Sequence, residues 1–248
     1  MKYSYSDIVK SLPAKKNSNS SLWVKMLIRK ISFFFTFIFI NMGFSPNAVS
    51  VLSILIVVLS CLCFAIGTLP SLIIAVVLIN FWLVLDCVDG NIARCKKMKT
   101  VYGEFVDDAS GYFLVAFVYL AMGLYVYNVG GVLVTKANQW FLVAGAVSSI
   151  CDILARLINK DYQLYSLKRS DYVMETYTNE NKKSLSYIRR RVGKELGISG
   201  LFMPLTILCT LFNAFDLMTL FYLAFNGFAL LSTTVLYIYK ANKYDKEC

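Results

Sequence analysis

Long apolar runs dominate the chain and determine its fold class. They occupy residues 48–68, 72–93, 103–127, 138–158, 198–212 and 217–239. A helix needs about 20 mostly apolar residues to cross a bilayer, and a spanning segment must satisfy its own backbone hydrogen bonds. A mean hydropathy of +0.60 with only 16% charged residues agrees with this. The sequence therefore predicts an all-α polytopic membrane protein with six transmembrane helices, the fifth kinked by Pro204.

The chain before the first span has a different character. Residues 1–47 are predicted to form a cytoplasmic N-terminus that ends in an amphipathic interfacial helix, because the apolar part at 31–40 is too short to span. A spanning helix is the alternative. Residues 48–240 form the six-helix membrane domain, and residues 241–248 form a cytoplasmic tail.

Positive charge is distributed asymmetrically between the two sides. Of the 25 Lys and Arg residues, only Lys136 falls in the connections 128–137 and 213–216. Cytoplasmic loops carry the excess of Lys and Arg, so both termini and the connection after the second span are predicted to lie in the cytoplasm, at the cell membrane. This placement accounts for the net charge of +10 without a nucleic-acid partner, and the absence of histidine excludes histidine-based catalysis.

Charged residues gather at the junction of the second and third spans, in residues 86–111. Five of them are carboxylates: Asp86, Asp89, Glu104, Asp107 and Asp108. Asp86 and Asp89 are three residues apart on one helix face. A short connection should make the two helices antiparallel neighbours, so that Asp107 joins them. Oxygen ligands at this density suit Mg²⁺, Mn²⁺ or Ca²⁺.

Other residues of this stretch suit a phosphate ligand. Gly90 and Gly103 leave backbone bare for the approach of a bulky group, and Arg94 offers a planar fork of donors. Together they favour phosphoryl transfer, in which a metal ion and cations neutralise developing charge. The alternative is a solvated helix edge on which the carboxylates pair with Arg94, Lys96 and Lys97.

The spacing in this stretch resembles the motif of the CDP-alcohol phosphotransferase family. Seven of the eight fixed positions match: Asp86, Asp89, Gly90, Ala93, Arg94, Gly103 and Asp107. The resemblance implies displacement of CMP from a CDP-linked donor, such as CDP-diacylglycerol, by an acceptor alcohol, with Mg²⁺ or Mn²⁺ as cofactor. It also implies phospholipid biosynthesis as the setting, and a homodimer.

The family's residue roles carry over to the matching positions. By resemblance, Asp86, Asp89 and Asp107 would ligate metal on the CDP pyrophosphate. Gly90, Ala93 and Gly103 would let the cytidine and its phosphates approach the helices. Arg94 would support the carboxylate cluster or the donor phosphates.

The last motif position departs from the family. Its aspartate, which acts there as base on the acceptor hydroxyl, is Gly111 in this chain. On a helix, Asp108 lies about 60° and 4.5 Å from position 111, and Glu104 about 20° and 10 Å. Asp108 is therefore the nearer substitute base and Glu104 the weaker one.

Loss of this aspartate keeps several functions open. A metal-bound alkoxide or an acceptor that is already ionised needs less help from a base. Transfer to a glycan or another atypical acceptor, and a catalytically silent protein that binds the CDP donor, are the alternatives. A small-solute transporter is disfavoured, because transporter sites lie near the bilayer midplane.

Several other polar residues carry predictions. The basic patch at residues 189–194 is predicted to anchor the topology at an anionic surface, with a phosphate pocket as the alternative. Asp152 and Arg156 should form an ion pair within the fourth span. Asn80 and Asn226 should make interhelical hydrogen bonds.

Overall fold

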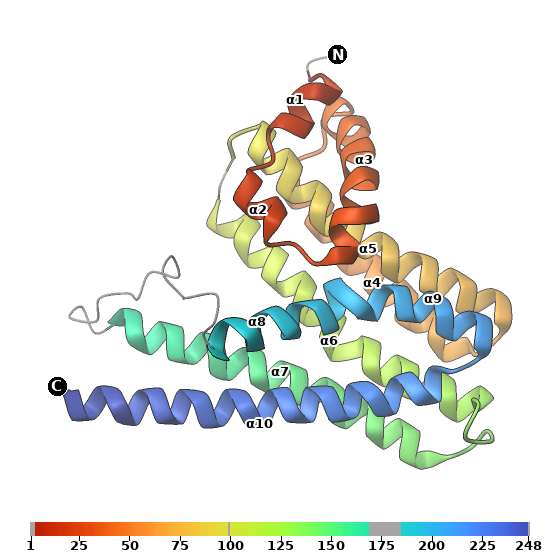
Figure 1. Cartoon of the computed structure of the whole chain (residues 1–248). Helices are drawn as coiled ribbons and strands as arrows, with labels where there is room; N and C mark the ends of the chain where they lie inside the picture. Colours follow the sequence, from red (N-terminus) through yellow and green to blue (C-terminus); the bar gives the residue numbers. More distant parts are fainter. Residues whose placement is uncertain (1–2, 99, 169–184, 248) are drawn as a thin grey trace.

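The computed structural model of the chain describes residues 3–98, 100–168 and 185–247 (Figure 1). Every regular element in these ranges is helical, and six segments are long and apolar enough to cross a membrane. These are α4 (Pro46–Ile66), α5 (Leu69–Cys95), α6 (Val101–Val129), α7 (Gln139–Lys168), Arg191–Phe212 and α10 (Phe215–Glu247). The prediction of an all-α polytopic membrane protein is confirmed.

The N-terminal segment forms short helices ahead of the spans. They are α1 (Tyr5–Lys10), α2 (Ala14–Ser18), the π-helical turn η1 (Val24–Ile28) and α3 (Arg29–Asn41). With 13 residues, α3 is too short to cross a bilayer. Its axis is steeply inclined to those of α9 and α10 (Figure 1). An interfacial position remains a prediction.

Local sequence signals determine where the spans beside the polar stretch begin. Ser45 ends the preceding turn, and its Oγ accepts the Ala48 N–H at 3.1 Å. Proline follows at the first position of α4, where no backbone N–H is required. The hydroxyl of Thr100 caps α6 by accepting the Gly103 N–H at 3.1 Å.

The fifth span is broken, one turn before the expected position. It consists of η2 (Ile198–Phe202) and α9 (Met203–Phe212), preceded by α8 (Leu185–Leu196). The break is at Gly200, with φ −106° and ψ −107°. Pro204 itself lies in the first turn of α9. The ring of a proline clashes with the carbonyl four residues earlier, so the distortion falls at Gly200 and not at Pro204.

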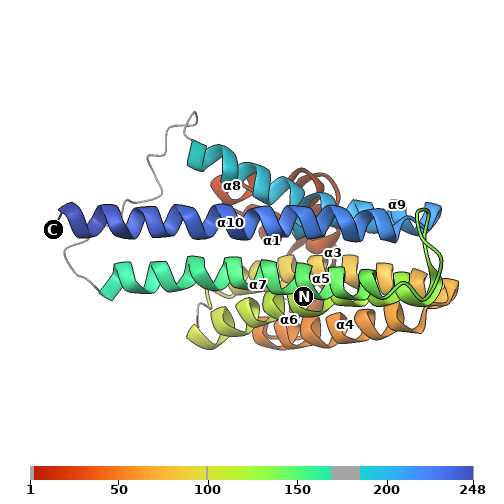
Figure 2. The ribbon, with the colours of Figure 1, turned by 90° about the horizontal axis from the view of Figure 1, so that it is seen from below.

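The arrangement of the spans corrects one expectation. Helix α4 packs along both α5 and α6, so these two helices are not simple direct neighbours. They meet through side chains, as where Trp82 Nε1 donates to Ser110 Oγ at 2.8 Å. On the other side of α6 lie α7 and α10 (Figure 2). The separation between α5 and α6 leaves room for a polar site between the two halves of the motif.

Polar contacts inside the bundle agree with the sequence. Arg156 Nε donates to Asp152 at 2.8 Å on α7. Asn226 Nδ2 of α10 donates to Ser148 Oγ of α7 at 2.9 Å. Asn80 Nδ2 of α5 donates to Thr206 Oγ1 of α9 at 3.2 Å. Because a polar group is costly in hydrocarbon, these contacts help to fix which helices are neighbours.

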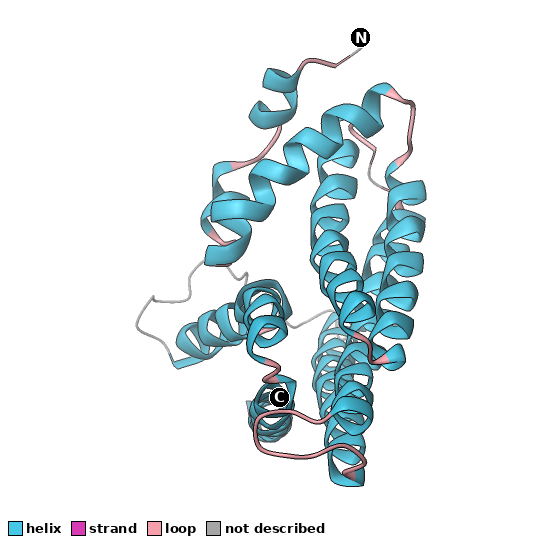
Figure 3. Cartoon of the chain, turned by 90° about the vertical axis from the view of Figure 1, so that its right-hand side faces the viewer, coloured by secondary structure: helices cyan, strands magenta, loops and turns pink. Residues whose placement is uncertain are grey.

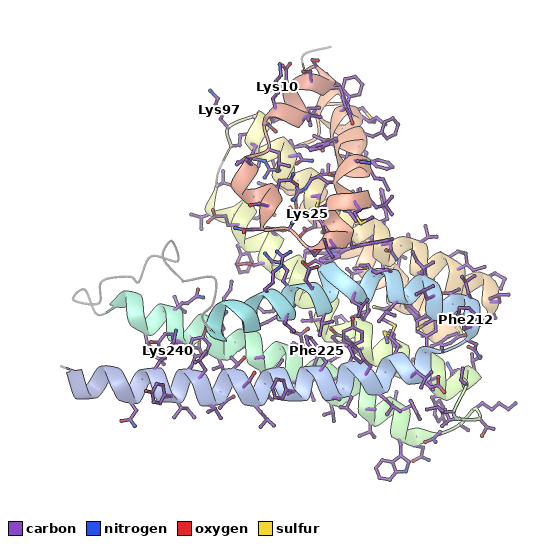
Figure 4. All side chains as sticks on the ribbon, in the orientation of Figure 1. Lys10, Lys25, Lys97, Phe212, Phe225 and Lys240 are labelled. Atoms are coloured by element: carbon purple, nitrogen blue, oxygen red, sulfur yellow. The ribbon has the colours of Figure 1, made fainter. Side chains whose placement is uncertain are left out.

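The two ends of the bundle differ in charge. Lys97 and Lys240 lie toward one end of the spans, and Phe212 lies at the other (Figure 4). This is the asymmetry on which the predicted orientation rests. Part of the basic patch at 189–194 is described, and there Arg191 pairs with Glu195 at 2.7 Å. The side chains of Arg189 and Arg190, which belong to the same predicted patch, lie outside the described residues.

Candidate active site

A cavity of about 430 Å³ opens where α4, α5 and α6 come together. Its wall includes most of the predicted site: Asp89, Gly90, Ala93, Arg94, Gly103, Glu104 and Asp107. Its polar lining also includes Lys16 of α2, Asn47 and Ser50 of α4, and Lys97 and Thr100 from the connection between α5 and α6. Residues from both sides of the connection between α5 and α6 therefore face one space, with α4 at its back.

Asp89 is held deep in this cavity by a residue that the motif does not contain. Its side chain is only 6% exposed. Ser50 Oγ of α4 donates to Asp89 Oδ2 at 2.6 Å. One turn further along α4, Ser53 Oγ lies 2.6 Å from Ser110 Oγ of α6. The recurrence of serine along one face of an apolar span is the sequence signal that could have identified this contact.

Asp86 and Asp107 interact directly across the space between α5 and α6. Two carboxylates in contact repel each other unless a cation or a proton lies between them. No carboxylate of the three has a Lys or Arg within ion-pair distance in the described part of the chain. Lys16 acts electrostatically on Asp86 and Asp107 from beyond that distance, so the cluster is an oxygen-rich site without a direct ion pair.

The fit of this cluster to a divalent cation rests on its donor atoms. Carboxylate oxygens are the ligands that Mg²⁺ and Mn²⁺ prefer, and Asp86 and Asp107 already converge. Among the described residues, no three acidic or thiol side chains stand at the spacing of a preformed metal site. In this arrangement Asp89 is hydrogen-bonded to Ser50. Asp89 and Asp107 line the same cavity and Asp86 contacts Asp107, so the oxygen donors of these three residues fit a divalent metal.

Arg94 is positioned by a chain of hydrogen bonds that leads to α3. Its Nη2 donates to Asn91 Oδ1. Asn91 is fully buried, and its Nδ2 donates to Thr36 Oγ1 at 3.0 Å and Ser32 Oγ at 3.3 Å. The Nε of Arg94 is buried without a partner in the described residues. The guanidinium of Arg94 lines the cavity and is held in position by Asn91, so it suits phosphate oxygens.

The glycines of the site differ in how much space surrounds them. A Cβ on Gly103 would lie 2.9 Å from Asn47 Oδ1 and 3.0 Å from Thr100 Oγ1. A Cβ on Gly90 would lie 3.3 Å from Arg94 Nη1. Only hydrogen fits at Gly103 without displacement of a neighbour. Around Gly111, by contrast, a Cβ would have no heavy atom within 4 Å.

The two candidate bases are in different positions. Asp108 is ion-paired to Lys160 of α7, with 2.5 Å between Oδ2 and Nζ, and its side chain is 56% exposed. Successive helical residues are about 100° apart, so Asp108 turns away when Asp107 faces the cavity. Glu104, one turn before Asp107 in the sequence, lines the cavity. The structure thus brings Glu104 to the site and leaves Asp108 outside its wall.

Lys16 is a site residue that the sequence did not reveal. It comes from the five-residue helix α2, and it lies 3.7 Å from the Cβ position of Gly90. Burial lowers the pKa of Lys16, and the positive charges of Arg94 and Arg29 lower it further, whereas Asp86 opposes the shift. A lysine in a polar N-terminal segment carries no local signal of such a position.

These features define a class: a polytopic membrane protein with a polar cavity at the ends of its spans, lined by three carboxylates and three cations. The model of the CDP-alcohol phosphatidyltransferase family matches residues 44–175, more than half of the chain. The chain therefore belongs to this family of transferases, which use CDP-alcohols and form phosphodiesters. Comparison with curated proteins gives no match.

Proposed function

We propose that this protein displaces CMP from a CDP-linked donor with an acceptor alcohol and forms a phosphodiester in phospholipid biosynthesis. The single observation that supports this best is the common cavity of Asp89, Arg94, Gly103 and Asp107. In the reaction, the acceptor hydroxyl oxygen forms a bond to the donor phosphorus. The bond from this phosphorus to the CMP oxygen breaks, and the hydroxyl proton is released.

Each residue has a role that follows from its surroundings. Asp86, Asp89 and Asp107 would hold Mg²⁺ or Mn²⁺, which would neutralise charge on the donor pyrophosphate when bound. Ser50 holds Asp89 in place through its hydrogen bond. Arg94 would bind the donor phosphates, since its fork lines the cavity and is not paired with a carboxylate of the described chain.

The proton of the acceptor requires a separate assignment. Position 111 carries no side chain to accept it. Glu104 is the better candidate than Asp108, because it lines the cavity whereas Asp108 lies outside the cavity wall. A base positioned in this way contributes about 10²- to 10⁴-fold to a rate.

A second function is supported by Gly111 itself. The open space at this residue leaves the acceptor side without the carboxylate of the motif. A protein that binds the CDP donor without turnover would have this site. Transfer to a glycan would be a variant of the first function. We also propose a setting in the cell membrane with the cavity facing the cytoplasm, and a homodimeric assembly, as the resemblance implies.

The test is CMP release by the purified protein with Mg²⁺ or Mn²⁺ and a panel of CDP donors and acceptor alcohols. We expect release that stops on chelation of the metal and in Asp107→Asn. The matched control is Asp161→Asn, since Asp161 is an exposed carboxylate of α7. Donor binding without CMP release from any pair would establish the silent alternative.

A further inference from the structure

Lys16 lies beside the carboxylate cluster although it is not part of the motif. It belongs to α2, ahead of the residues 44–175 that match the family. It lines the active-site cavity together with Asp89 and Asp107. It also lines an adjoining cavity of about 330 Å³ together with Asp86. The side chain of Lys16 is therefore found where the two cavities meet, next to all three carboxylates.

The charge of Lys16 acts on the two carboxylates that contact each other. It attracts both Asp86 and Asp107, without an ion pair to either in the described part of the chain. Arg29 also attracts Asp86, but it is only 6% exposed and its Nη2 donates to Ser20 Oγ at 2.8 Å. Lys16 is exposed and carries its charge on a flexible stem of four carbons. Its ammonium can therefore leave the cluster, whereas Arg29 is fixed in position.

The backbone that carries Lys16 is held beside the cavity by cations of other segments. Lys25 Nζ donates to the Ser18 carbonyl at 2.8 Å, and Lys194 Nζ donates to the Asn19 carbonyl at 2.6 Å. These bonds fix the chain just after Lys16. A charged group on a short flexible tether has an effective concentration on the order of millimolar at the site that it can reach. The Lys16 ammonium is therefore a permanent competitor for the cluster.

A divalent cation and the Lys16 ammonium cannot both lie close to the cluster without repulsion. Like charges repel, and the repulsion is larger where water is partly excluded. A metal ion held by Asp86, Asp89 and Asp107 would bring two positive charges to the carboxylates on which Lys16 now acts. Binding of the ion therefore requires that the ammonium withdraw toward solvent.

We propose that Lys16 is an exchangeable counter-cation of the carboxylate cluster, which a divalent metal ion must displace. This inference rests on the proposed function, because it takes Asp86, Asp89 and Asp107 as the metal ligands. The exchange is electrostatic, and no covalent bond forms or breaks. Lys16 partly balances the charge of the cluster in the absence of metal, and it lowers the affinity of the free protein for the ion.

The position of Lys16 also makes metal binding dependent on the donor. Its Nζ lies 3.7 Å from the position that a Cβ on Gly90 would occupy. A pyrophosphate bound beside Gly90 would bring negative charge to this ammonium, which would offset its repulsion by the metal ion. The ion then binds weakly alone and more tightly together with the donor. Such a coupling is reciprocal, so the ion also strengthens binding of the donor.

The test is the binding of Mn²⁺ to the purified full-length protein, followed by the electron paramagnetic resonance signal of the free ion. In the absence of donor, we expect Lys16→Met to bind Mn²⁺ about tenfold more tightly than the parent, which corresponds to about 1.4 kcal/mol. Lys16→Arg keeps the charge and should bind the ion as weakly as the parent. Addition of CDP should strengthen Mn²⁺ binding more in the parent than in Lys16→Met. Asp107→Asn should abolish the binding and so assign the ion to the cluster.

Lys10→Met is the matched control, because Lys10 of α1 is exposed and lies outside the walls of both cavities. It removes the same charge, and we expect the affinity for Mn²⁺ to be unchanged. A second readout needs no substitution and remains valid if Lys16→Met fails to fold. Lysines of the parent are acetylated with and without Mn²⁺, and the products are identified by mass spectrometry. We expect Mn²⁺ to accelerate acetylation of Lys16 and to leave that of Lys10 unchanged.

Failure of this inference and failure of the proposed function give different results. Tighter Mn²⁺ binding in Lys16→Met, without CMP release from any donor and acceptor, would contradict the transferase and retain the role of Lys16. Metal-dependent CMP release with equal Mn²⁺ affinity in the parent and Lys16→Met would retain the transferase and overturn the counter-cation.

Three other results would also overturn the counter-cation. Equal strengthening in Lys16→Met and Lys10→Met would show a general effect of net charge. Mn²⁺ binding that persists in Asp107→Asn would place the ion outside the cluster. Acetylation of Lys16 that does not respond to Mn²⁺ would show that its ammonium is not displaced.

Discussion

The close contact of α6 with α4 at Gly103 makes a quantitative prediction possible. In Gly103→Ala, the new Cβ would lie 2.9 Å from Asn47 Oδ1 and 3.0 Å from Thr100 Oγ1. Both distances are shorter than ordinary contacts, so at least one neighbour must move. Thr100 caps α6 through the Gly103 N–H, and Asn47 lines the cavity. The substitution therefore affects helix stability and the cavity wall together.

The expected size of the effect follows from these contacts. Overpacking costs about 1–3 kcal/mol, and a weakened N-cap costs about 0.5–2 kcal/mol. Replacement of glycine by alanine within a helix stabilises the helix by about 0.5–1 kcal/mol. From these three terms, we expect Gly103→Ala to be less stable than the parent by about 0.5–4.5 kcal/mol. Displacement of Asn47 should weaken donor binding about tenfold, or about 1.4 kcal/mol.

The assay is thermal unfolding and CDP-donor binding of the purified protein. Gly227→Ala in α10 is the matched control, because a Cβ at this position meets no heavy atom within 4 Å. We expect the control to be stabilised or unchanged and to bind the donor normally. If Gly103→Ala behaves like Gly227→Ala in both measurements, close approach at Gly103 is not required and the proposed donor position is wrong.

Three further substitutions test the other parts of the site. Ser50→Ala removes the hydrogen bond to Asp89, and we expect about a 10- to 100-fold higher metal requirement in a titration of CMP release; an unchanged requirement would contradict a metal role for Asp89. Gly111→Asp fits the open space, and we expect normal expression and faster CMP release with neutral acceptors; no change with any acceptor would separate position 111 from the site. Asn91→Leu leaves Arg94 without its hydrogen-bond partner, and steady-state kinetics should show a KM for the donor about tenfold higher with kcat nearly unchanged; a loss confined to kcat would argue against phosphate binding by Arg94.

The features that the sequence predicts well are local. Span lengths follow from apolar runs, and the start of α4 follows from Ser45 and Pro46. Helical spacing within the motif likewise places Gly103 and Asp107 of α6 on the wall of one cavity. All of these predictions use residues that are close together in the chain. For such residues, the period of the helix is sufficient to predict which of them share a face.

The features that the sequence did not reveal depend on long-range packing. Asp108 was the preferred base on helix geometry alone, but it faces α7, where Lys160 lies 52 residues further along the chain. The sequence of the connection between α5 and α6 also does not indicate that α4 lies between these two helices. Helix periodicity gives the face on which a residue lies, and it does not give the neighbour that this face meets.

The N-terminal segment has a larger part in the site than its composition suggests. It covers one side of the motif helices (Figure 3), and its helix α3 holds Asn91 and through it Arg94. The family match begins at residue 44, after this segment. Lys16, which lines the cavity, and Ser32 and Thr36, which hold Asn91, therefore lie outside the matched range. The position of Arg94 in this chain therefore depends on α3 residues that lie outside both the motif and the matched range.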